Sequence, residues 1–580
     1  MWNISKRELS QDVDRHRKPF ENQTRRAAMS DNQAFQAMDD DHRISMGQWR
    51  ESMRHSSASS SSCLIKQSRQ SEVLKMAIQT APVAKTETHK EYRGRIRIWP
   101  GLLLLVLLVI GAAVSFAIAG QKAHEAAKER QRAANALKFK NISGSLLTPD
   151  MIASAVDTAD DDGEVGNPKV YASSKCAALN YLSKNGKMYA ALPNGTEVPF
   201  SVKGVNWFGM ETGLAIPFGL WQNDKNGTTA FVIAAFLQAN KFNAVRLPVC
   251  IQNILLNTKP EKSLVNAQSN RALDLTSYMS TLQSIIKVLG YRNIGVMISL
   301  HTLTTMVSGG NWYSEALGVS KDDFLTAVDK LTKNLCTNEY WNILGLDAKN
   351  EPHQASWSEF SDGATIIGNR MLKGCPKWMI FVEGVNQGTN SVNIDGTTFE
   401  YFDWWGGGLQ EAGSKPVNLA MSNKLVYAPH YYNTGVFPQK YFYGSSLSDE
   451  LDDATLKRRV EGTSYSMFGY LNKKQDAAVV LGEFAGLYAK DAHPKKTTKR
   501  TTDCLIQMMI EEKYAGGFMW SLNPESAYQY NPATSPGTYT EGLLMDDWLT
   551  PNKEFLKGMA AMEGLPDVRF LPCVPTTDDS

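Results

Sequence analysis

An uncharged apolar run in the first quarter of the chain constrains its fold more than any other feature. The 23 residues 98–120 include no charged side chain. At about 1.5 Å rise per residue, a helix of this length crosses the roughly 30 Å hydrocarbon layer of a membrane. A signal peptide would have a shorter apolar region near the chain start, and a buried core helix would have polar positions on some face. The run therefore predicts one transmembrane helix over residues 98–120.

The segments on either side of this run differ in character. Residues 1–97 carry 18 Lys and Arg against 12 Asp and Glu and include a serine-rich stretch. This composition predicts a mostly disordered basic tail on the cytoplasmic side, with a short folded element around residues 74–78 as the alternative. Residues 121–169 combine an Ala-, Lys- and Glu-rich stretch with an acidic one, which predicts a helical stalk followed by a linker.

The charge of the whole chain is close to balance. Its 61 basic and 59 acidic residues leave a net charge of +2, which predicts no nucleic-acid partner because no strong positive field surrounds the protein. With 43% hydrophobic residues the chain is not disordered throughout, and seven cysteines in 580 residues exclude a small disulfide-stabilised protein. A large folded domain is expected over residues 170–575, which hold ten of the thirteen tryptophans.

Eight short β-rich runs recur in this domain. They cover residues 202–206, 243–247, 295–300, 343–346, 378–382, 424–428, 478–481 and 517–520. Several are almost continuously apolar, as parallel strands buried on both faces are, and amphipathic segments such as 229–239 and 275–289 lie between them. The alternation predicts an α/β fold, a (β/α)8 TIM barrel with insertions; a doubly wound open sheet is the alternative.

Side chains able to do chemistry stand at or just past the ends of most of these runs. They are Arg246, His301, Asn350, Glu351, Glu383, His430, Tyr432, Glu483 and Trp520. A (β/α)8 barrel gathers the C-terminal ends of its strands at one rim, where the active sites of such barrels lie. The pattern predicts that these residues converge on one cleft.

Two glutamates on different strands suit glycoside hydrolysis, in which one carboxyl group protonates the leaving oxygen and the other attacks the sugar or activates water. Glu351 and Glu483 are the candidates, although each taken alone could be an ordinary surface or helix-capping glutamate. The tripeptide Asn350-Glu351-Pro352 adds specificity because it follows a predicted strand. The sequence contains no HExxH, GxSxG or GxxxxGK[ST] motif, so we predict no metal and no other cofactor.

The motifs at the strand ends occur in a characteristic order. They are Gly204-Val205-Asn206-Trp207-Phe208-Gly209, Val245-Arg246-Leu247-Pro248, Leu300-His301, Lys349-Asn350-Glu351-Pro352, His430-Tyr431-Tyr432, Gly482-Glu483-Phe484 and Met519-Trp520-Ser521-Leu522. This ordered set resembles glycoside hydrolase family 5, the cellulase-type retaining β-glycosidases with (β/α)8 barrels. The resemblance spans most of residues 202–523.

The resemblance implies different roles for the two glutamates. Glu351 would be the acid/base and Glu483 the nucleophile, with Arg246 and Tyr432 positioning Glu483 and keeping it ionised. The charge of Glu483 would keep a proton on Glu351 until Glu483 is glycosylated, after which Glu351 would act as a base toward water. The two carboxyl groups would then lie about 5 to 5.5 Å apart, the spacing of retaining enzymes.

The remaining rim residues would bind substrate or support the site. By the resemblance, Asn350 would bind the sugar 2-hydroxyl, His301 and His430 would hold polar groups, and Trp520 would be the platform for the sugar at subsite −1. Glu383 is expected to have a supporting role.

Further tryptophans near the strands could present flat faces to sugar rings, with core packing as the alternative. They are Trp207, which we predict to bind substrate, and Trp221, Trp312, Trp357, Trp404 and Trp405.

The predicted partner is a β-linked polysaccharide or oligosaccharide. The endoglucanase-like first motif favours endo action on β-1,4-glucan, while β-1,3-glucan, mannan and transglycosylation would use the same residues. A membrane-tethered carbohydrate receptor without turnover is the alternative from another class. The sequence does not determine the oligomeric state.

Basic residues flank the apolar run almost equally, so the orientation of the helix rests on other features. The C-terminal part holds glycosylation sequons at Asn141, Asn194 and Asn226, and six cysteines that allow three disulfide bridges. Of the pairings, Cys336 with Cys375 is expected because these two are nearest in sequence. Together with the carbohydrate chemistry, these features predict a type II single-pass protein of the plasma membrane with an extracellular catalytic domain.

Overall fold

A computed structural model describes residues 98–157, 160, 162–172, 174–386 and 388–576. The predicted tail, residues 1–97, lies outside the described residues. The chain divides into two compact units, Met1–Gln131 and Arg132–Ser580, and each is described by itself.

The predicted apolar helix is present in the first unit. It belongs to α2 (Ile98–Ser143), a continuous helix of 46 residues that includes the Ala- and Lys-rich segment predicted as a stalk and continues into the second unit. Within the part of the chain that the structure describes, α2 is the one helix long and apolar enough to cross a membrane. Leu103, Leu105 and Ile110 illustrate its apolar run, in which the side chains are exposed.

The second unit is built around a closed parallel barrel. Its strands are β4 (Val202–Asn206), β5 (Ala244–Cys250), β6 (Gly295–Thr302), β7 (Ile343–Asp347), β8 (Met379–Val382), β11 (Leu425–Tyr427), β12 (His430–Tyr432), β13 (Ala478–Val479), β14 (Leu481–Ala485) and β15 (Gly516–Trp520). β11 and β12 are halves of the sixth barrel strand, interrupted at Pro429, which cannot donate a ladder hydrogen bond. β13 and β14 are likewise halves of the seventh.

The pairing closes the circle. β4 to β8 pair in sequence order, β8 pairs with β11, β11 with β13 and β12 with β14. β14 pairs with β15, and β15 pairs with β4. All eight predicted strands are present, and the closure confirms the (β/α)8 barrel and excludes the open sheet.

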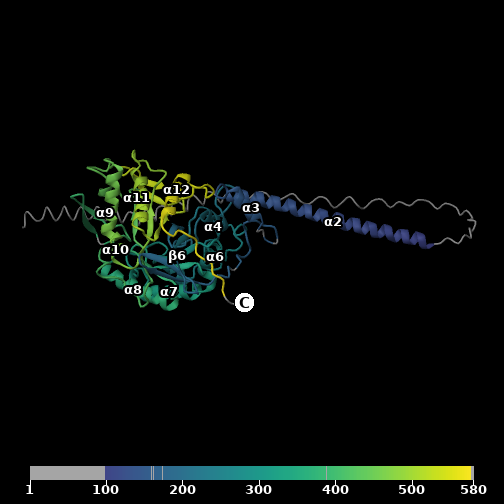
Figure 1. Ribbon diagram of the computed structural model, residues 1–580, viewed down its shortest axis with the longest axis horizontal. Helices are drawn as coiled ribbons and strands as arrows, with labels where there is room; N and C mark the ends of the chain where they lie inside the picture. The colour runs from purple at the N-terminus through teal and green to yellow at the C-terminus, as the bar shows by residue number, and fades with distance from the viewer. Residues whose placement is uncertain (1–97, 158–159, 161, 173, 387, 577–580) are drawn as a thin grey trace, which may run out of the picture. The chain divides into compact units, whose positions relative to one another are not determined.

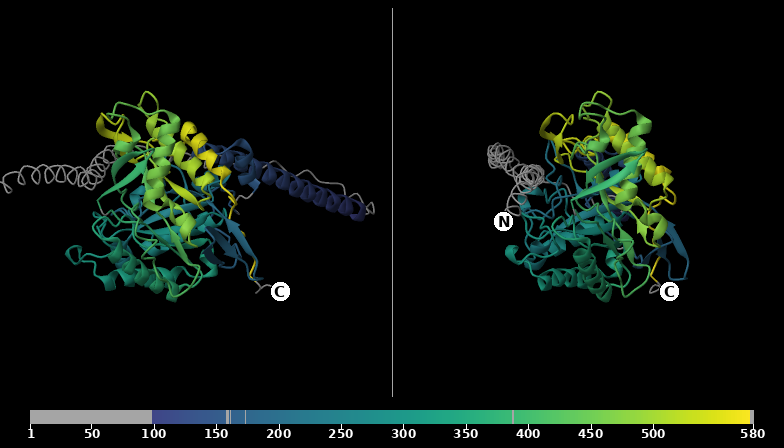
Figure 2. Two further views of the ribbon diagram at one scale, coloured as in Figure 1. Left: turned by 60° about the vertical axis from the view of Figure 1, so that its left-hand side comes forward. Right: turned by 90° about the vertical axis from the view of Figure 1, so that its left-hand side faces the viewer.

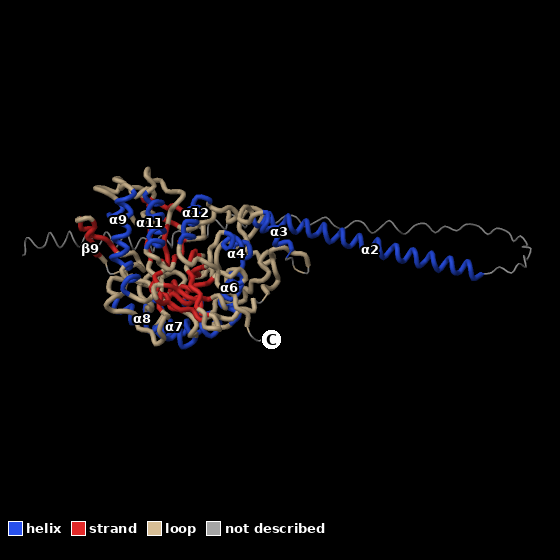
Figure 3. Tube along the Cα trace, viewed as in Figure 1, coloured by secondary structure: helices blue, strands red, loops and turns tan. Residues whose placement is uncertain are grey.

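Helices surround the strands, as Figure 3 shows for α6, α7, α8, α9 and α11. The helices of the second unit are α3 (Pro149–Asp157), α4 (Ala230–Ala239), α5 (Ile251–Leu256), α6 (Tyr278–Gly290), α7 (Lys321–Leu335), α8 (Trp357–Gly374), α9 (Asp453–Ser464), α10 (Leu471–Lys474), α11 (Thr497–Glu511) and α12 (Lys553–Met559). Ser277, Ser320 and Ser356 begin α6, α7 and α8 with capping boxes, which satisfy the first free N–H groups of each helix.

A small antiparallel sheet covers the N-terminal end of the barrel. It consists of β1 (Asn180–Lys184), β2 (Lys187–Ala191) and β3 (Glu197–Phe200). Tyr181 and Met188 of this sheet share a hydrophobic cluster with Val202, Met379 and Ala478, which begin barrel strands. The C-terminal segment of the chain returns to the same sheet (Figure 2), where Cys573 forms a disulfide with Cys176, just before β1. The barrel is therefore plugged at the end opposite the predicted site.

Two hairpins follow barrel strands on the side of the predicted site. β9 (Thr389–Ile394) and β10 (Thr397–Phe402) come after β8, and β16 (Ala527–Tyr530) and β17 (Pro536–Thr540) come after β15. The hydroxyl of Tyr528 in β16 donates to the carbonyl of Trp520 at the end of β15 (3.3 Å), which fixes the second hairpin at the barrel rim.

The predicted pairing of Cys336 with Cys375 is confirmed, but two bridges are present among the described residues where six cysteines would allow three. Cys336 and Cys375 are bonded and join the C-terminal ends of the neighbouring helices α7 and α8. Cys176 is bonded to Cys573. The third bridge does not form because Cys250 ends strand β5 whereas Cys504 lies in α11, and both are buried free thiols.

The segment before the barrel contacts the barrel domain. Phe139 near the end of α2 is buried, with its ring 5.8 Å from that of Phe231 in α4. Further along, Asp160 and Asp162 form ion pairs of 2.9 and 2.5 Å with Arg271.

Candidate active site

Arg246 on β5 lies at the centre of the predicted cleft, and its side chain is fully buried. Its guanidinium binds three carboxylates: Nη1 binds Glu483 Oε1, Nη2 lies 2.8 Å from Asp347 Oδ2, and Nη2 lies 3.0 Å from Glu383 Oε1. It also donates to Asn350 Oδ1 over 2.8 Å. Burial opposes the charge of Arg246, but the carboxylates outweigh it and raise the pKa. A permanently charged group thus joins β5 to the ends of β7, β8 and β14.

Glu483 is held on both carboxylate oxygens. Oε1 accepts from Arg246 and Oε2 accepts from the Tyr432 hydroxyl. Its strand β14 pairs with β12 in a register that places Glu483 opposite His430. Two donors on one carboxylate fix its orientation.

Glu351 follows β7 on an unusual piece of backbone. Its φ is +48°, in the left-handed region that non-glycine residues rarely adopt. Its main-chain N–H donates to Glu383 Oε2 over 2.7 Å, and its carboxylate Oε1 lies 3.1 Å from His430 Nδ1. Burial, and after it the charge of Glu483, raise the pKa of Glu351 above its usual value, although contact with His430 opposes the shift.

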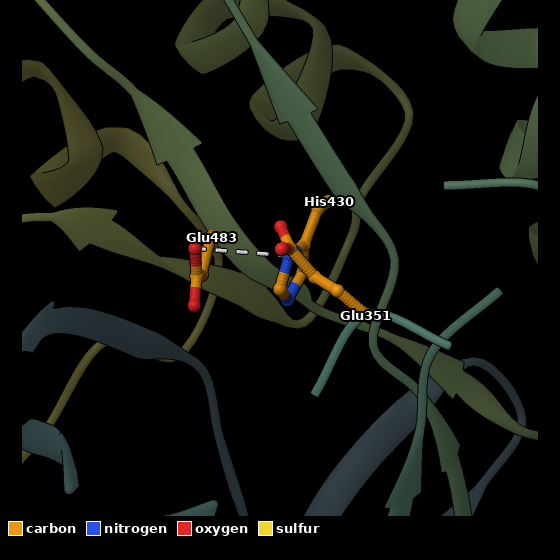
Figure 4. A group of neighbouring side chains, drawn as sticks. All are labelled: Glu351, His430 and Glu483. Atoms are coloured by element: carbon orange, nitrogen blue, oxygen red, sulfur yellow. Dashed lines mark hydrogen bonds and ion pairs between the residues drawn. The ribbon is translucent and has the colours of Figure 1, made fainter. Parts of the chain in front are cut away.

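His430 lies between the carboxylates. Its Nδ1 is 3.1 Å from Glu351 Oε1 and its Nε2 is 3.1 Å from Glu383 Oε1. Burial alone would lower the pKa of His430, but Glu383, Glu483 and Glu351 raise it well above the usual value. The imidazole is therefore held as a cation, and Figure 4 shows it gathered with Glu351 and Glu483.

The spacing of the two predicted catalytic carboxylates is short. One oxygen of Glu351, one oxygen of Glu483 and a ring nitrogen of His430 all lie within 4.8 Å of one another. These donor types could bind a cation, but both oxygens of Glu483 already accept hydrogen bonds from Arg246 and Tyr432. At this spacing both carboxyl groups can reach the same glycosidic bond.

Three flat rings stand in a row at the rim of the barrel. Trp520, which is partly exposed, stacks on Phe208 with ring centroids 5.4 Å apart and on His301 with centroids 6.1 Å apart. The structure thus places His301 and Trp520 beside each other, as the sequence predicts for strand ends that meet at one rim. Such a surface suits the C–H face of a sugar ring.

Trp207 is not part of this surface, so the prediction that it binds substrate is wrong. Its side chain is buried, and its indole N–H donates to the carbonyl of Phe218 over 3.0 Å. Trp312, Trp357 and Trp404 are also buried. Trp405 is partly exposed and stacks on His353 with centroids 3.8 Å apart.

Three further polar residues belong to the site and were not predicted as site residues from the sequence. Asn206, the last residue of β4, accepts from Arg246 Nη1 over 2.9 Å, and Asp347, the last of β7, accepts from Arg246 Nε over 3.1 Å. Burial and the charge of Glu383 raise the pKa of Asp347 to about 7 despite that contact. The third is Lys349, between Asp347 and Asn350, which is fully buried. The strand-end rule that found the other residues would have found Asn206 and Asp347.

A closed (β/α)8 barrel with two neighbouring glutamates at its rim, one held by arginine and tyrosine, defines the class of barrel glycoside hydrolases. Residues 194–526 match the family model "Cellulase (glycosyl hydrolase family 5)". The chain belongs to glycosyl hydrolase family 5, and it is a glycosidase that hydrolyses O-glycosyl compounds.

Curated relatives include an endoglucanase of Paenibacillus polymyxa, 28% identical over 369 residues that cover 62% of this chain and 81% of the relative. The major extracellular endoglucanase of Xanthomonas campestris is 30% identical over 364 residues, covering 61% of this chain and 66% of that protein. Among solved structures, an endocellulase from Pyrococcus horikoshii in complex with cellotetraose is 29% identical with a TM-score of 0.55, covering 67% of this chain and 99% of that one.

Proposed function

We propose that the chain is a retaining endo-β-1,4-glucanase in which Glu483 is the nucleophile and Glu351 the acid/base. The observation that carries the proposal is the difference between the two carboxyl groups. Arg246 and Tyr432 hold both oxygens of Glu483, whereas Glu351 is partly exposed, has a raised pKa and lies beside Glu483. The raised pKa favours a proton on Glu351, while the two donors orient Glu483 for attack.

In the first half-reaction, Glu483 attacks the anomeric carbon while Glu351 gives its proton to the departing glycosidic oxygen. The products are a glycosyl ester on Glu483 and the other part of the glucan chain, which leaves with a free hydroxyl group. Oε2 of Glu483 lies 3.7 Å from His430 Nδ1, and the same nitrogen lies 3.1 Å from Glu351 Oε1. The short separation of the two groups leaves no room for a water between a base and the sugar, which supports retention over inversion.

In the second half-reaction, water replaces the departed sugar. Glu351 has lost its proton to the departing oxygen. Because the ester removes the negative charge of Glu483, the pKa of Glu351 falls, so Glu351 stays ionised and can take a proton from the water as the water attacks. The water attacks the anomeric carbon from the side of Glu351 and releases Glu483. Two displacements restore the original configuration.

The relatives support β-1,4-glucan as the substrate. Those named above are endoglucanases and an endocellulase, the latter bound to cellotetraose. The exposed ring of Trp520 in its row with Phe208 and His301 fits a β-linked pyranose chain, whose flat faces alternate along its length. Hydrolysis of β-1,3-glucan or mannan, and transglycosylation, remain as outcomes of the same test.

The test compares wild type with Glu351→Gln and Glu483→Gln on carboxymethyl-cellulose, β-1,3-glucan, mannan and aryl β-cellobiosides. We expect wild type to shorten cellulose and release β-configured product by NMR, and each variant to lose at least about 10³-fold in kcat. A 2-deoxy-2-fluoro cellobioside should add one glycosyl group to Glu483 by mass spectrometry. Product of inverted configuration would contradict retention. If no substrate were turned over in a way that the two substitutions reduce, the alternative of a carbohydrate receptor without catalytic activity would be favoured.

We also propose that α2 anchors the protein as a type II single-pass protein of the plasma membrane, with the barrel outside the cell. The disulfides support an oxidising compartment. Of the sequons, Asn194 lies exposed in the turn between β2 and β3. When the protein is made in cells that carry out N-glycosylation, we expect N-glycanase to lower its mass, and Asn194→Gln to make that decrease smaller. We also expect protease added to intact cells to digest the barrel. A barrel protected on intact cells would contradict this orientation.

A further inference from the structure

A buried lysine, Lys349, directly precedes Asn350 and the proposed acid/base Glu351 in the loop after β7. Lys349 lies two residues past the end of β7, and its side chain is fully buried. Its ammonium donates to the carbonyl oxygen of His301 over 3.1 Å and to Ser308 Oγ over 3.2 Å. It also donates to the carbonyl oxygen of Asn350. The lysine thus connects the end of β6 to the loop after β7.

The carbonyl of Asn350 and the N–H of Glu351 belong to the same peptide group. Lys349 binds that group at its oxygen, and Glu383 binds it at its nitrogen over 2.7 Å. A planar peptide held at both ends cannot rotate without breaking one of these two buried hydrogen bonds. The orientation of this peptide sets φ of Glu351, which is +48°.

The left-handed backbone of Glu351 is disfavoured for a residue with a side chain, so the surroundings must hold it. In this conformation, the carboxylate of Glu351 lies 3.1 Å from His430 and close to Glu483. A rotation of the peptide toward ordinary backbone angles would move that carboxylate away from the position of the departing oxygen.

We propose that Lys349 is a positioning residue for the acid/base: its ammonium, opposite Glu383, fixes the Asn350–Glu351 peptide and so aims the Glu351 carboxyl group. The proposal rests on the role proposed above for Glu351. Through the carbonyl of His301, the same ammonium also ties the acid loop to the ring row of His301 and Trp520. Lys349 therefore links the position of the acid, Glu351, to that of Trp520, the proposed platform for the sugar.

The proposal predicts a particular kinetic defect. A misaimed acid matters most when the leaving group is a poor one that needs a proton, and least when it leaves as a stable anion. For Lys349→Met, in the full chain purified in detergent, we expect kcat/KM to fall about 30-fold or more on phenyl β-cellobioside. On 2,4-dinitrophenyl β-cellobioside the fall should stay below about threefold.

Two further variants set the scale. Glu351→Ala should show the same dependence on the leaving group more steeply, with azide rescue of the dinitrophenyl substrate. Lys424→Met is the matched control, because Lys424 is also buried and donates to Asn180 Oδ1 (2.6 Å) and to the carbonyl of Tyr181 (2.7 Å), near the plugged end of the barrel. It should lower stability and leave the leaving-group dependence of wild type unchanged.

Lys349→Gln covers the case in which Lys349→Met does not fold. It keeps an N–H donor on a shorter side chain, and we expect the same selective loss at smaller size. An equal loss on both substrates for the folded Lys349 variant, as in a general structural defect, would overturn the proposal. Failure of the proposed function is distinct: Glu351→Ala would then show no leaving-group dependence.

Discussion

The main-chain N–H of Glu351 donates a hydrogen bond of 2.7 Å to Oε2 of Glu383. The other oxygen of Glu383 lies 3.0 Å from Arg246 and 3.1 Å from His430. This third acid therefore contacts the backbone of one predicted catalytic residue and the two cations that face the other. Because Glu383 is fully buried, we expect it to support the other site residues and not to contact substrate.

Glu383→Gln should lower kcat by about 10- to 100-fold while KM changes little. The amide keeps the size of the side chain but removes the negative charge that balances Arg246 and His430, which leaves buried cations less well compensated. Steady-state kinetics on a soluble cello-oligosaccharide would measure both constants. If Glu383→Gln abolished turnover while Glu483→Gln did not, the assignment of the nucleophile would be wrong.

The pKa of Glu351 should respond in opposite directions to its two neighbours. Burial and the charge of Glu483 raise it, and contact with His430 lowers it. Glu483→Gln removes a negative charge and should lower the pKa of Glu351, whereas His430→Asn removes a cation and should raise it. NMR titration of 13C-labelled glutamate carboxyl groups would report both shifts. A shift in the same direction for both variants would contradict this account.

Glu525→Gln should make stability less dependent on pH. Burial raises the pKa of Glu525 from 4.5 to about 7, and its Oε1 accepts from Trp548 Nε1 over 2.8 Å. In the part of the chain that the structure describes, its buried Oε2 has no hydrogen-bond partner. Between about pH 4.5 and 7 the unfolded chain loses this proton first, so the native state binds more protons and stability falls as pH rises.

At pH 8 the free energy of unfolding of the glutamine variant, measured by guanidinium unfolding, should therefore exceed that of wild type by about 3 kcal/mol, whereas at pH 4.5 the two should be close. Glu512→Gln is a control, since Glu512 lies at the end of α11 in a surface ion pair with Lys473. An equal effect at both pH values would show that the titration of Glu525 is not the cause.

Phe139→Ala should destabilise the barrel domain by about 3 kcal/mol, the usual cost of emptying a buried aromatic site. Phe139 is 2% exposed and packs against Phe231, and it lies close enough to Gly166 that a side chain there would collide with its ring. Leu137→Ala, two residues earlier and 61% exposed, is the matched control and should change stability little. Guanidinium unfolding of the full chain in detergent would measure both, and equal effects would contradict the contact.

Much of the fold could be predicted because it depends on local pattern. Each barrel strand is a short apolar run, and the runs alternate with amphipathic segments, so the barrel followed from periodicity. The break in the sixth strand follows from Pro429, but the break in the seventh could not be anticipated in the same way. It depends on pairing with the sixth strand, since β11 with β13 and β12 with β14 are separate pairs.

The candidate site divides in a similar way. Glu351 follows β7, and Arg246 and Glu483 lie within β5 and β14. All three belong to predicted strands or follow one closely, so the sequence indicates that they meet. Trp207 and Trp520 look alike in sequence, yet one donates to a carbonyl in the core and the other lies partly exposed beside Phe208. Burial depends on what lies across the barrel, which adjacent residues do not reveal.

The sequence by itself determined the apolar helix, the order of the strands and the identity of the two glutamates, because these depend on residue type and spacing along the chain. The tertiary structure decided which groups surround them. Asp347, Glu383 and Glu483 reach Arg246 from three strands, and Lys349 and Glu383 bind opposite ends of one peptide. Such contacts join residues far apart in sequence, and closure of the barrel brings them within hydrogen-bonding distance.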